Sequence, residues 1–182
     1  LTANLAGETP RVAGVLNLRA VDLAPLARNP AAASDLTGTL RLDLALPPSE
    51  AGGPAVGTFA ARLPRARAAG YEAADVRANG RVDGMRVRLA EATARAYGAS
   101  ARLAGLIVPA SESRGTPLTV DLSGSMAGLD LGRLPADLDV PRAVSRLDFD
   151  FLLAGTLEAL RGEARLRESM LAGATLAPGT TA

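Results

Sequence analysis

A glycine followed by alternating apolar residues recurs along the chain, and this pattern restricts the fold more than any other feature. Copies begin at Gly14, Gly38, Gly80, Gly124 and Gly155. Glycine reaches the positive φ values of turns and bulges, and a period of two places successive side chains on opposite faces of a strand. We therefore expect a mainly β fold in which glycine turns or bulges lead one strand after another.

The alternation also predicts which side chains share a sheet face. Four leucines alternate with polar or small residues over residues 40–46, which is typical of a strand with one dry and one wet face. The next run, at 56–63, is expected to pair with it as a hairpin. The candidate residues of one apolar face are Leu40, Leu42, Leu44, Leu46, Leu118, Val120, Leu122, Leu147, Phe149 and Phe151.

One stretch is ambiguous between strand and helix. Residues 89–96 are rich in Ala, Glu and Arg, which are good helix formers. Glycines at 98 and 105 interrupt the residues after it, and the neighbouring segments alternate with a period of two. We therefore expect a strand there, with a helix as the alternative.

Two short segments interrupt the strand pattern and resemble each other, at 21–28 and 129–135. Each carries an aspartate, Asp22 or Asp130, where it can cap a helical turn. We expect one or two short helices here, and a loose internal repeat around 11–46 and 116–151. Because the chain begins at Leu1 rather than Met, we interpret residues 1–182 as a single β-rich segment of a longer repeat-like protein.

Composition excludes several function classes. All 20 basic residues are arginine and 19 acidic residues nearly balance them, while aromatic residues make up only 3%; a nucleic-acid surface is therefore not expected. The absence of His, Cys and Lys removes the usual nucleophile and base pairs. We expect no enzymatic activity, no cofactor and no metal.

Charged residues offer weaker candidates. Asp148 with Asp150, or Asp137 with Asp139, would suit a calcium site or the acid pair of a carbohydrate-acting domain. A structural role is the favoured interpretation of these carboxylates, with Asp148 and Asp150 on a solvated strand face opposite the apolar residues of the same strand. The arginines at 62, 65 and 67 suit lipid headgroups or an acidic partner, but we favour an exposed sheet edge, where arginine discourages stray strand pairing.

The apolar face has two interpretations. It is either an open trough that binds an apolar ligand, or the closed core of a structural β-sandwich or β-solenoid module of a surface or secreted protein. The sequence pattern is the same in both cases.

Three stretches carry a family resemblance. The repeated pattern of an apolar residue, Asp-Leu, two residues and Leu at 21–26 and 129–134, together with residues 75–82, resembles the AsmA-like family and its TamB type. The resemblance implies an elongated, curved antiparallel sheet, shaped like a taco, whose apolar groove conducts phospholipids across the periplasm. It also implies that acyl chains contact the apolar residues named above.

The resemblance carries further expectations about location and partners. Its parent protein would be anchored in the inner membrane, would support outer-membrane biogenesis in the cell envelope, and would engage an outer-membrane barrel of the Omp85 type.

Overall fold

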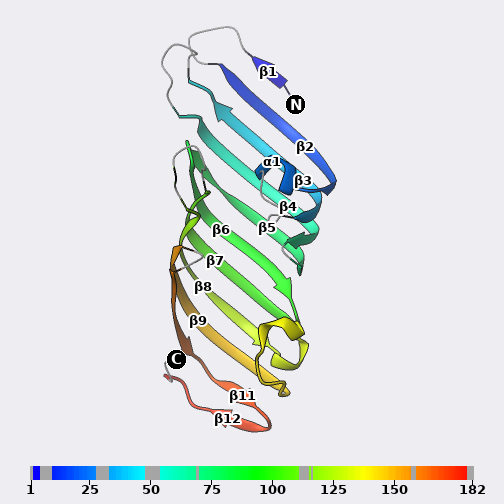
Figure 1. Ribbon diagram of the computed structural model, residues 1–182, viewed down its shortest axis with the longest axis vertical. Helices are drawn as coiled ribbons and strands as arrows, with labels where there is room; N and C mark the ends of the chain where they lie inside the picture. The colour runs from blue at the N-terminus through cyan, green and yellow to red at the C-terminus, as the bar shows by residue number, and fades with distance from the viewer. Residues whose placement is uncertain are drawn as a thin grey trace.

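The strands form one antiparallel sheet in which each strand pairs mainly with its neighbours in sequence. The computed structural model describes residues 2–4, 10–27, 33–47, 54–68, 70–110, 115, 117–156 and 159–179. Twelve strands follow the order β1 to β9, then β11 and β12, with β10 also paired to β9 (Figure 1). The mainly β fold that the alternation predicts is confirmed, and so is the antiparallel sheet that the resemblance implies.

Long strands make up the body of the sheet, and short ones lie at its ends. The strands are β1 (Thr2–Asn4), β2 (Arg11–Val21), β3 (Ser34–Ala45), β4 (Val56–Ala68), β5 (Tyr71–Asp83), β6 (Arg86–Ala96), β7 (Ala99–Val108), β8 (Thr119–Leu129), β9 (Ser145–Thr156), β10 (Ala159–Leu166), β11 (Ser169–Leu171) and β12 (Ala174–Leu176). The helical segments are the single turn α1 (Ala24–Ala27) and the 3-10 turns η3 (Leu131–Arg133) and η4 (Ala136–Leu138).

Tight turns join the central strands. Gly84, between β5 and β6, has a φ of 59°, and Tyr97 and Gly98, between β6 and β7, have φ values of 51° and 85°. Such left-handed conformations match the twist of hairpin strands and favour glycine. Residues 89–96 lie within β6, so the strand expected there is confirmed. The expected pairing of 56–63 with the preceding leucine strand is the β3–β4 ladder.

The recurring glycines lie inside strands instead of leading them, which corrects the expectation that each one opens a strand. They belong to β2, β3, β5, β8 and β9, and the register shifts beside only two of them, Gly38 and Gly80. The neighbouring backbone comes close at these two positions. A Cβ atom on Gly38 would clash with the carbonyl oxygen of Arg62, and one on Gly80 with that of Arg88. Glycines of this kind allow strands to bend and the sheet to curve.

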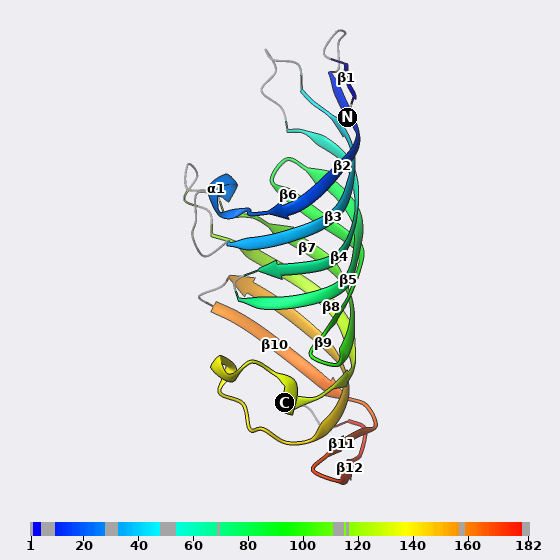
Figure 2. The same ribbon diagram turned by 90° about the vertical axis from the view of Figure 1, so that its right-hand side faces the viewer.

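The bent sheet has the shape of a trough. Its strands cross from one wall to the other, and the trough follows the long axis of the molecule (Figure 1). Figure 2 shows α1 and the η3–η4 segment on the same side of the sheet. Both follow a long strand and precede another, since β2 leads through α1 to β3 and β8 leads through η3 and η4 to β9. The two regions suspected of repeating thus have the same layout.

Candidate functional site

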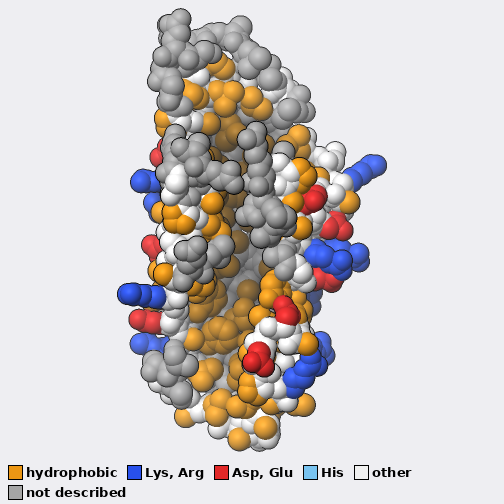
Figure 3. All heavy atoms as spheres, viewed as in Figure 1, with side chains coloured by type: hydrophobic (Ala, Val, Ile, Leu, Met, Phe, Trp, Pro, Cys, Tyr) orange, Lys and Arg blue, Asp and Glu red, His pale blue; other side chains and the backbone are white. Residues whose placement is uncertain are grey.

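The candidate site is the inner face of the trough, which is apolar along every long strand from β2 to β10. The register joins its residues into three continuous cross-strand rows. These run Val12, Leu44, Gly57, Val82, Val87, Ile107, Val120, Gly155, Leu160; then Gly14, Leu42, Phe59, Gly80, Leu89, Gly105, Leu122, Leu153, Gly162; then Leu16, Leu40, Ala61, Ala78, Ala92, Leu103, Gly124, Phe151, Ala164. Figure 3 shows the hydrophobic side chains within the hollow and charged side chains at its margins.

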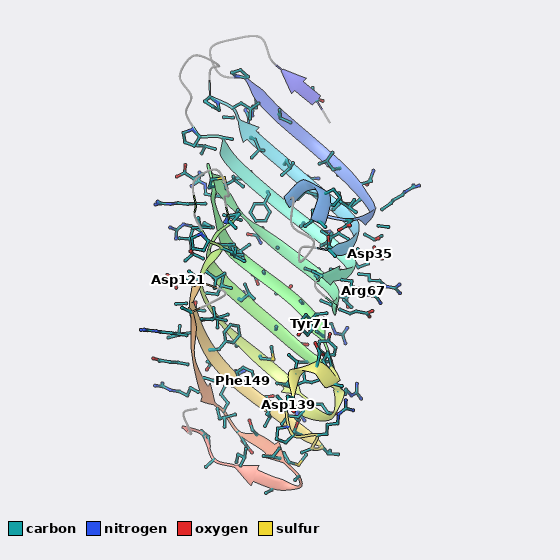
Figure 4. All side chains as sticks on the ribbon, viewed as in Figure 1. Asp35, Arg67, Tyr71, Asp121, Asp139 and Phe149 are labelled. Carbon is teal, nitrogen blue, oxygen red and sulfur yellow. The ribbon has the colours of Figure 1, made fainter. Side chains whose placement is uncertain are left out.

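The structure brings the predicted face residues together. Six of them lie in the three rows, namely Leu40, Leu42, Leu44, Val120, Leu122 and Phe151. Phe149 pairs with Met126, and Leu147 pairs with Leu129. Leu46 and Leu118 flank β3 and β8, just outside the strands. Figure 4 shows Phe149 over the sheet, whereas Asp121 and Arg67 lie at its margins.

The sequence pattern alone left part of this face unassigned, chiefly on the strands that were not singled out. The register adds Phe59, Leu89, Leu103, Ile107 and Leu153. A period-two search at 56–63, 86–89 and 103–107 would have found most of them.

Large side chains of the inner face lie over glycines on the next strand. Phe59 is the direct partner of Gly80, and its Cε1 atom would lie 3.0 Å from a Cβ at that position. Phe151 is likewise the partner of Gly124, with its Cζ atom 2.8 Å from a Cβ there. An aromatic ring that covers a cross-strand glycine fills the space left by the missing side chain. The two rings therefore occupy space that side chains at Gly80 and Gly124 would otherwise take.

No second layer covers the inner face within the part of the chain that the structure describes. Ala99 is the only buried hydrophobic residue there, and the residues in the rows are all partly exposed, apart from Gly80. The accessible surface is 12184 Å², whereas a compact monomer of this size exposes about 8200 Å². Over the described residues, the trough is therefore an open surface and not the core of a closed sandwich.

Aspartates cap the two helical segments, α1 and η3–η4, which lie along the rim of the trough where the long strands end; such caps are what the sequence predicts. Asp22 Oδ1 accepts hydrogen bonds from the backbone N–H groups of Ala24 and Ser34, at 3.0 and 2.9 Å. These bonds lower the pKa of the Asp22 carboxyl below its ordinary value. Asp130 Oδ1 accepts from the N–H of Gly132 at 3.0 Å and caps η3 in the same way.

The Asp22 cap predicts an acid transition. Because the folded pKa of Asp22 is lowered, its contribution to stability is complete above the unfolded pKa and is lost as the pH falls through the folded pKa. We expect the amide resonances of Ala24 and Ser34 to titrate together in an NMR experiment, with a midpoint below about 3.9. The Asp22→Asn variant keeps an acceptor oxygen and should show no such titration. A midpoint at or above the ordinary Asp value would contradict the cap.

A side-chain bond ties the η3–η4 segment to a strand far from it in sequence. The Tyr71 hydroxyl, at the start of β5, donates to Asp137 Oδ2 at 3.1 Å. This bond raises the pKa of the Tyr71 phenol. The bond is therefore kept at neutral pH and is lost only as the pH rises through the raised pKa. Tyr71 lies beside the segment that carries Asp139 (Figure 4). The segment therefore extends along the rim past the ends of β6, β7 and β8.

Removing this tie should loosen the rim without unfolding the sheet. For Tyr71→Phe we expect faster amide exchange at residues 136–139 and a change in melting temperature below about 3 °C. Tyr97→Phe is the matched control, because the Tyr97 hydroxyl accepts from the N–H of Glu72 at 3.0 Å and belongs to the sheet. Equal exchange at 136–139 in wild type and Tyr71→Phe would argue against the tie.

Three of the four candidate carboxylates have structural partners. Asp148 Oδ1 accepts from the N–H of Gly128 at 2.7 Å, and Asp150 lies 3.9 Å from Arg167. Asp137 binds Tyr71, and Asp139 lies in the left-handed region with a φ of 46°. Over the described ranges, no group of three or more Asp, Glu, His or Cys residues could hold a metal ion.

The outer face differs from the inner one, and the edge interpretation of its arginines is wrong. Arg62, Arg65 and Arg67 lie in β4, which pairs with β3 on one side and β5 on the other. Arg67 forms an ion pair with Glu72. A shallow hollow of about 750 Å³ lies farther along this face over β6 to β10. Its border is mixed in charge and includes Glu91, Arg102, Asp150 and Arg165.

Comparisons with known proteins add no relative. None of the helices in the described ranges is long and apolar enough to cross a membrane. No protein-family model, curated protein or solved structure matches this chain.

Proposed function

We propose that this chain is a non-enzymatic segment of a cell-envelope protein that binds phospholipid acyl chains in its trough and conducts them between the inner and outer membranes. The observation that carries the proposal is the inner face itself, with three uninterrupted apolar rows and, over the described residues, no covering layer. The resemblance to the AsmA-like family supports the periplasmic setting, an inner-membrane anchor in the parent protein and an Omp85-type barrel as its partner.

The chemistry of the trough suits a hydrocarbon chain better than a polar ligand. Its rows contain no hydrogen-bonding side chain, so it offers burial and no directional contacts. Each buried methylene contributes about 0.8 kcal/mol wherever it lies along a dry surface. A ligand held in this way slides along the trough at little cost, which is what conduction requires.

The dimensions agree with this use. Nine strands spaced about 4.8 Å apart give the rows a length of roughly 38 Å. One leaflet contributes about half of a 30 Å hydrocarbon core. The trough therefore holds more than one acyl-chain length in series, and a lipid has room to advance without leaving the apolar surface.

Native mass spectrometry of the purified segment, followed by organic extraction, tests this function. We expect phospholipid to co-purify or to be taken up from phosphatidylcholine vesicles in stoichiometric amounts. A fluorescent acyl-chain probe should compete for the same surface. A lipid-free mass that is unchanged after incubation with vesicles would contradict the proposal and favour a structural module.

A further inference from the structure

The outer face carries an arginine patch that the chain's net charge conceals. Arg62 on β4 is the direct cross-strand partner of Arg77 on β5, and Arg81 on β5 is the direct partner of Arg88 on β6. All four side chains are exposed. The two pairs are four residues apart along β5, or about 13 Å. Directly opposed residues lie about 5 Å apart, so the patch concentrates positive charge on one area of the outer face.

Neighbouring carboxylates do not neutralise this patch. Among the described residues, no carboxylate lies within 4 Å of the guanidinium groups of the four arginines. Glu91, which pairs with Asn79 between the two arginine pairs, is held by Arg102 at 2.8 Å. Asp43, on the neighbouring β3, is held by Arg11 at 2.6 Å. Asp83 lies two residues beyond Arg81, and its direct partner is Arg86.

This arrangement lowers the stability of the isolated sheet. Like charges directly opposite each other on neighbouring strands repel and oppose pairing. A negatively charged ligand across the patch would remove that repulsion and gain charge-assisted hydrogen bonds from planar guanidinium groups, which match phosphate geometry. The patch thus has the physical character of an anion-binding surface.

The surroundings of the patch favour lipid headgroups over a nucleic acid or a protein. All five aromatic residues of the chain lie elsewhere, since Phe59, Phe149 and Phe151 are on the inner face and Tyr71 and Tyr97 are at strand ends. Nucleic-acid bases therefore have nothing on which to stack. The patch also lacks the apolar, aromatic centre of protein interfaces, because Thr58, Ala60 and Asn79 lie between its arginines.

We propose that the arginine patch Arg62, Arg77, Arg81 and Arg88 docks the outer face of the sheet onto the phosphate groups of an anionic phospholipid bilayer. The patch lies on the face opposite the trough, so this docking does not depend on acyl-chain binding. It would hold the trough beside a membrane surface while the inner face stays open.

Vesicle co-sedimentation tests the docking. The probes are vesicles of phosphatidylcholine alone and of phosphatidylcholine with about one quarter phosphatidylglycerol. We expect tighter binding to the anionic vesicles that weakens as salt rises. The double variant Arg81→Gln, Arg88→Gln should bind them about thirtyfold more weakly, at roughly 1 kcal/mol for each arginine. The matched control Arg161→Gln, Arg165→Gln removes the same charge on β10 and should stay within about threefold of wild type.

Two further readouts distinguish docking through the patch from binding through the trough or to an acidic protein. The patch variant should melt at the same temperature as wild type or higher, because the cross-strand repulsion is gone, and it should still extract neutral lipid into the trough. Equal binding of wild type and patch variant to anionic vesicles would overturn the proposal. Equal binding of the wild type to neutral and anionic vesicles would overturn it too. Capture of the wild type by polyglutamate but not by anionic vesicles would also overturn it and would indicate an acidic protein partner.

Discussion

Replacing Gly124 by valine is expected to destabilise the sheet by about 3 kcal/mol or more. A Cβ at this position would clash with the carbonyl oxygen of Arg102, and it would lie 2.8 Å from Phe151 Cζ and 2.9 Å from Leu103 Cβ. Backbone cannot move aside as a flexible side chain does, and β8 is paired on both sides. The new side chain must therefore separate β8 from a neighbour or displace the phenylalanine ring.

Thermal unfolding measures this effect. For a chain of this length we expect Tm to fall by roughly 6–12 °C, with lower soluble yield. The control is Ser123→Val, one residue away on the outer face, where the same side chain has room and valine suits a strand. Equal melting temperatures for wild type and Gly124→Val would mean that the close approach of β7, β8 and β9 does not exist in solution.

Placing two carboxylates at the centre of the trough should abolish lipid uptake. Leu122 and Leu153 are direct partners on β8 and β9 and lie in the middle row of the inner face. In the Leu122→Asp, Leu153→Asp variant an acyl chain would have to desolvate two charges to occupy this part of the trough, which costs more than the methylene contacts gain. We expect lipid binding to weaken at least a hundredfold, because two charges would be buried without partners.

The matched control places the same charges on the other face. Ser123→Asp and Leu152→Asp replace direct partners one residue along each strand, and both side chains are exposed on the outer face. This control should bind lipid as wild type does. Circular dichroism must show strand structure in both variants, since an unfolded variant would lose binding whatever the trough does. Full lipid uptake by a folded inner-face variant would eliminate the trough as the binding surface.

The sequence predicts the strands well because alternation is a local property. The four leucines at 40–46 and the aspartate caps of Asp22 and Asp130 can be read without tertiary information. The roles of the internal glycines are predicted wrongly because a glycine interrupts the alternation in the same way whether it forms a turn or lets a neighbouring strand approach closely. Only the adjacent strand, such as β6 beside Gly80, decides between these roles.

The arginine patch could not be predicted for a related reason. Arg62, Arg77 and Arg88 belong to three strands, and the alternation assigns each one only to the polar side of its own strand. Register decides which of them become neighbours, and a slip of two residues would separate the pairs while keeping every face assignment. Face membership is therefore local information, whereas the patch depends on pairing between strands.

The sequential strand order also determines how this molecule can unfold. Because each long strand from β2 to β8 pairs only with the strands before and after it in the chain, the free energy of this part of the sheet approximates a sum of nearest-neighbour terms, as in a one-dimensional polymer. Unfolding can then start at either end and advance strand by strand. A substitution that disrupts a central strand divides the sheet into two shorter sheets. Each surviving fragment would keep part of the apolar inner face.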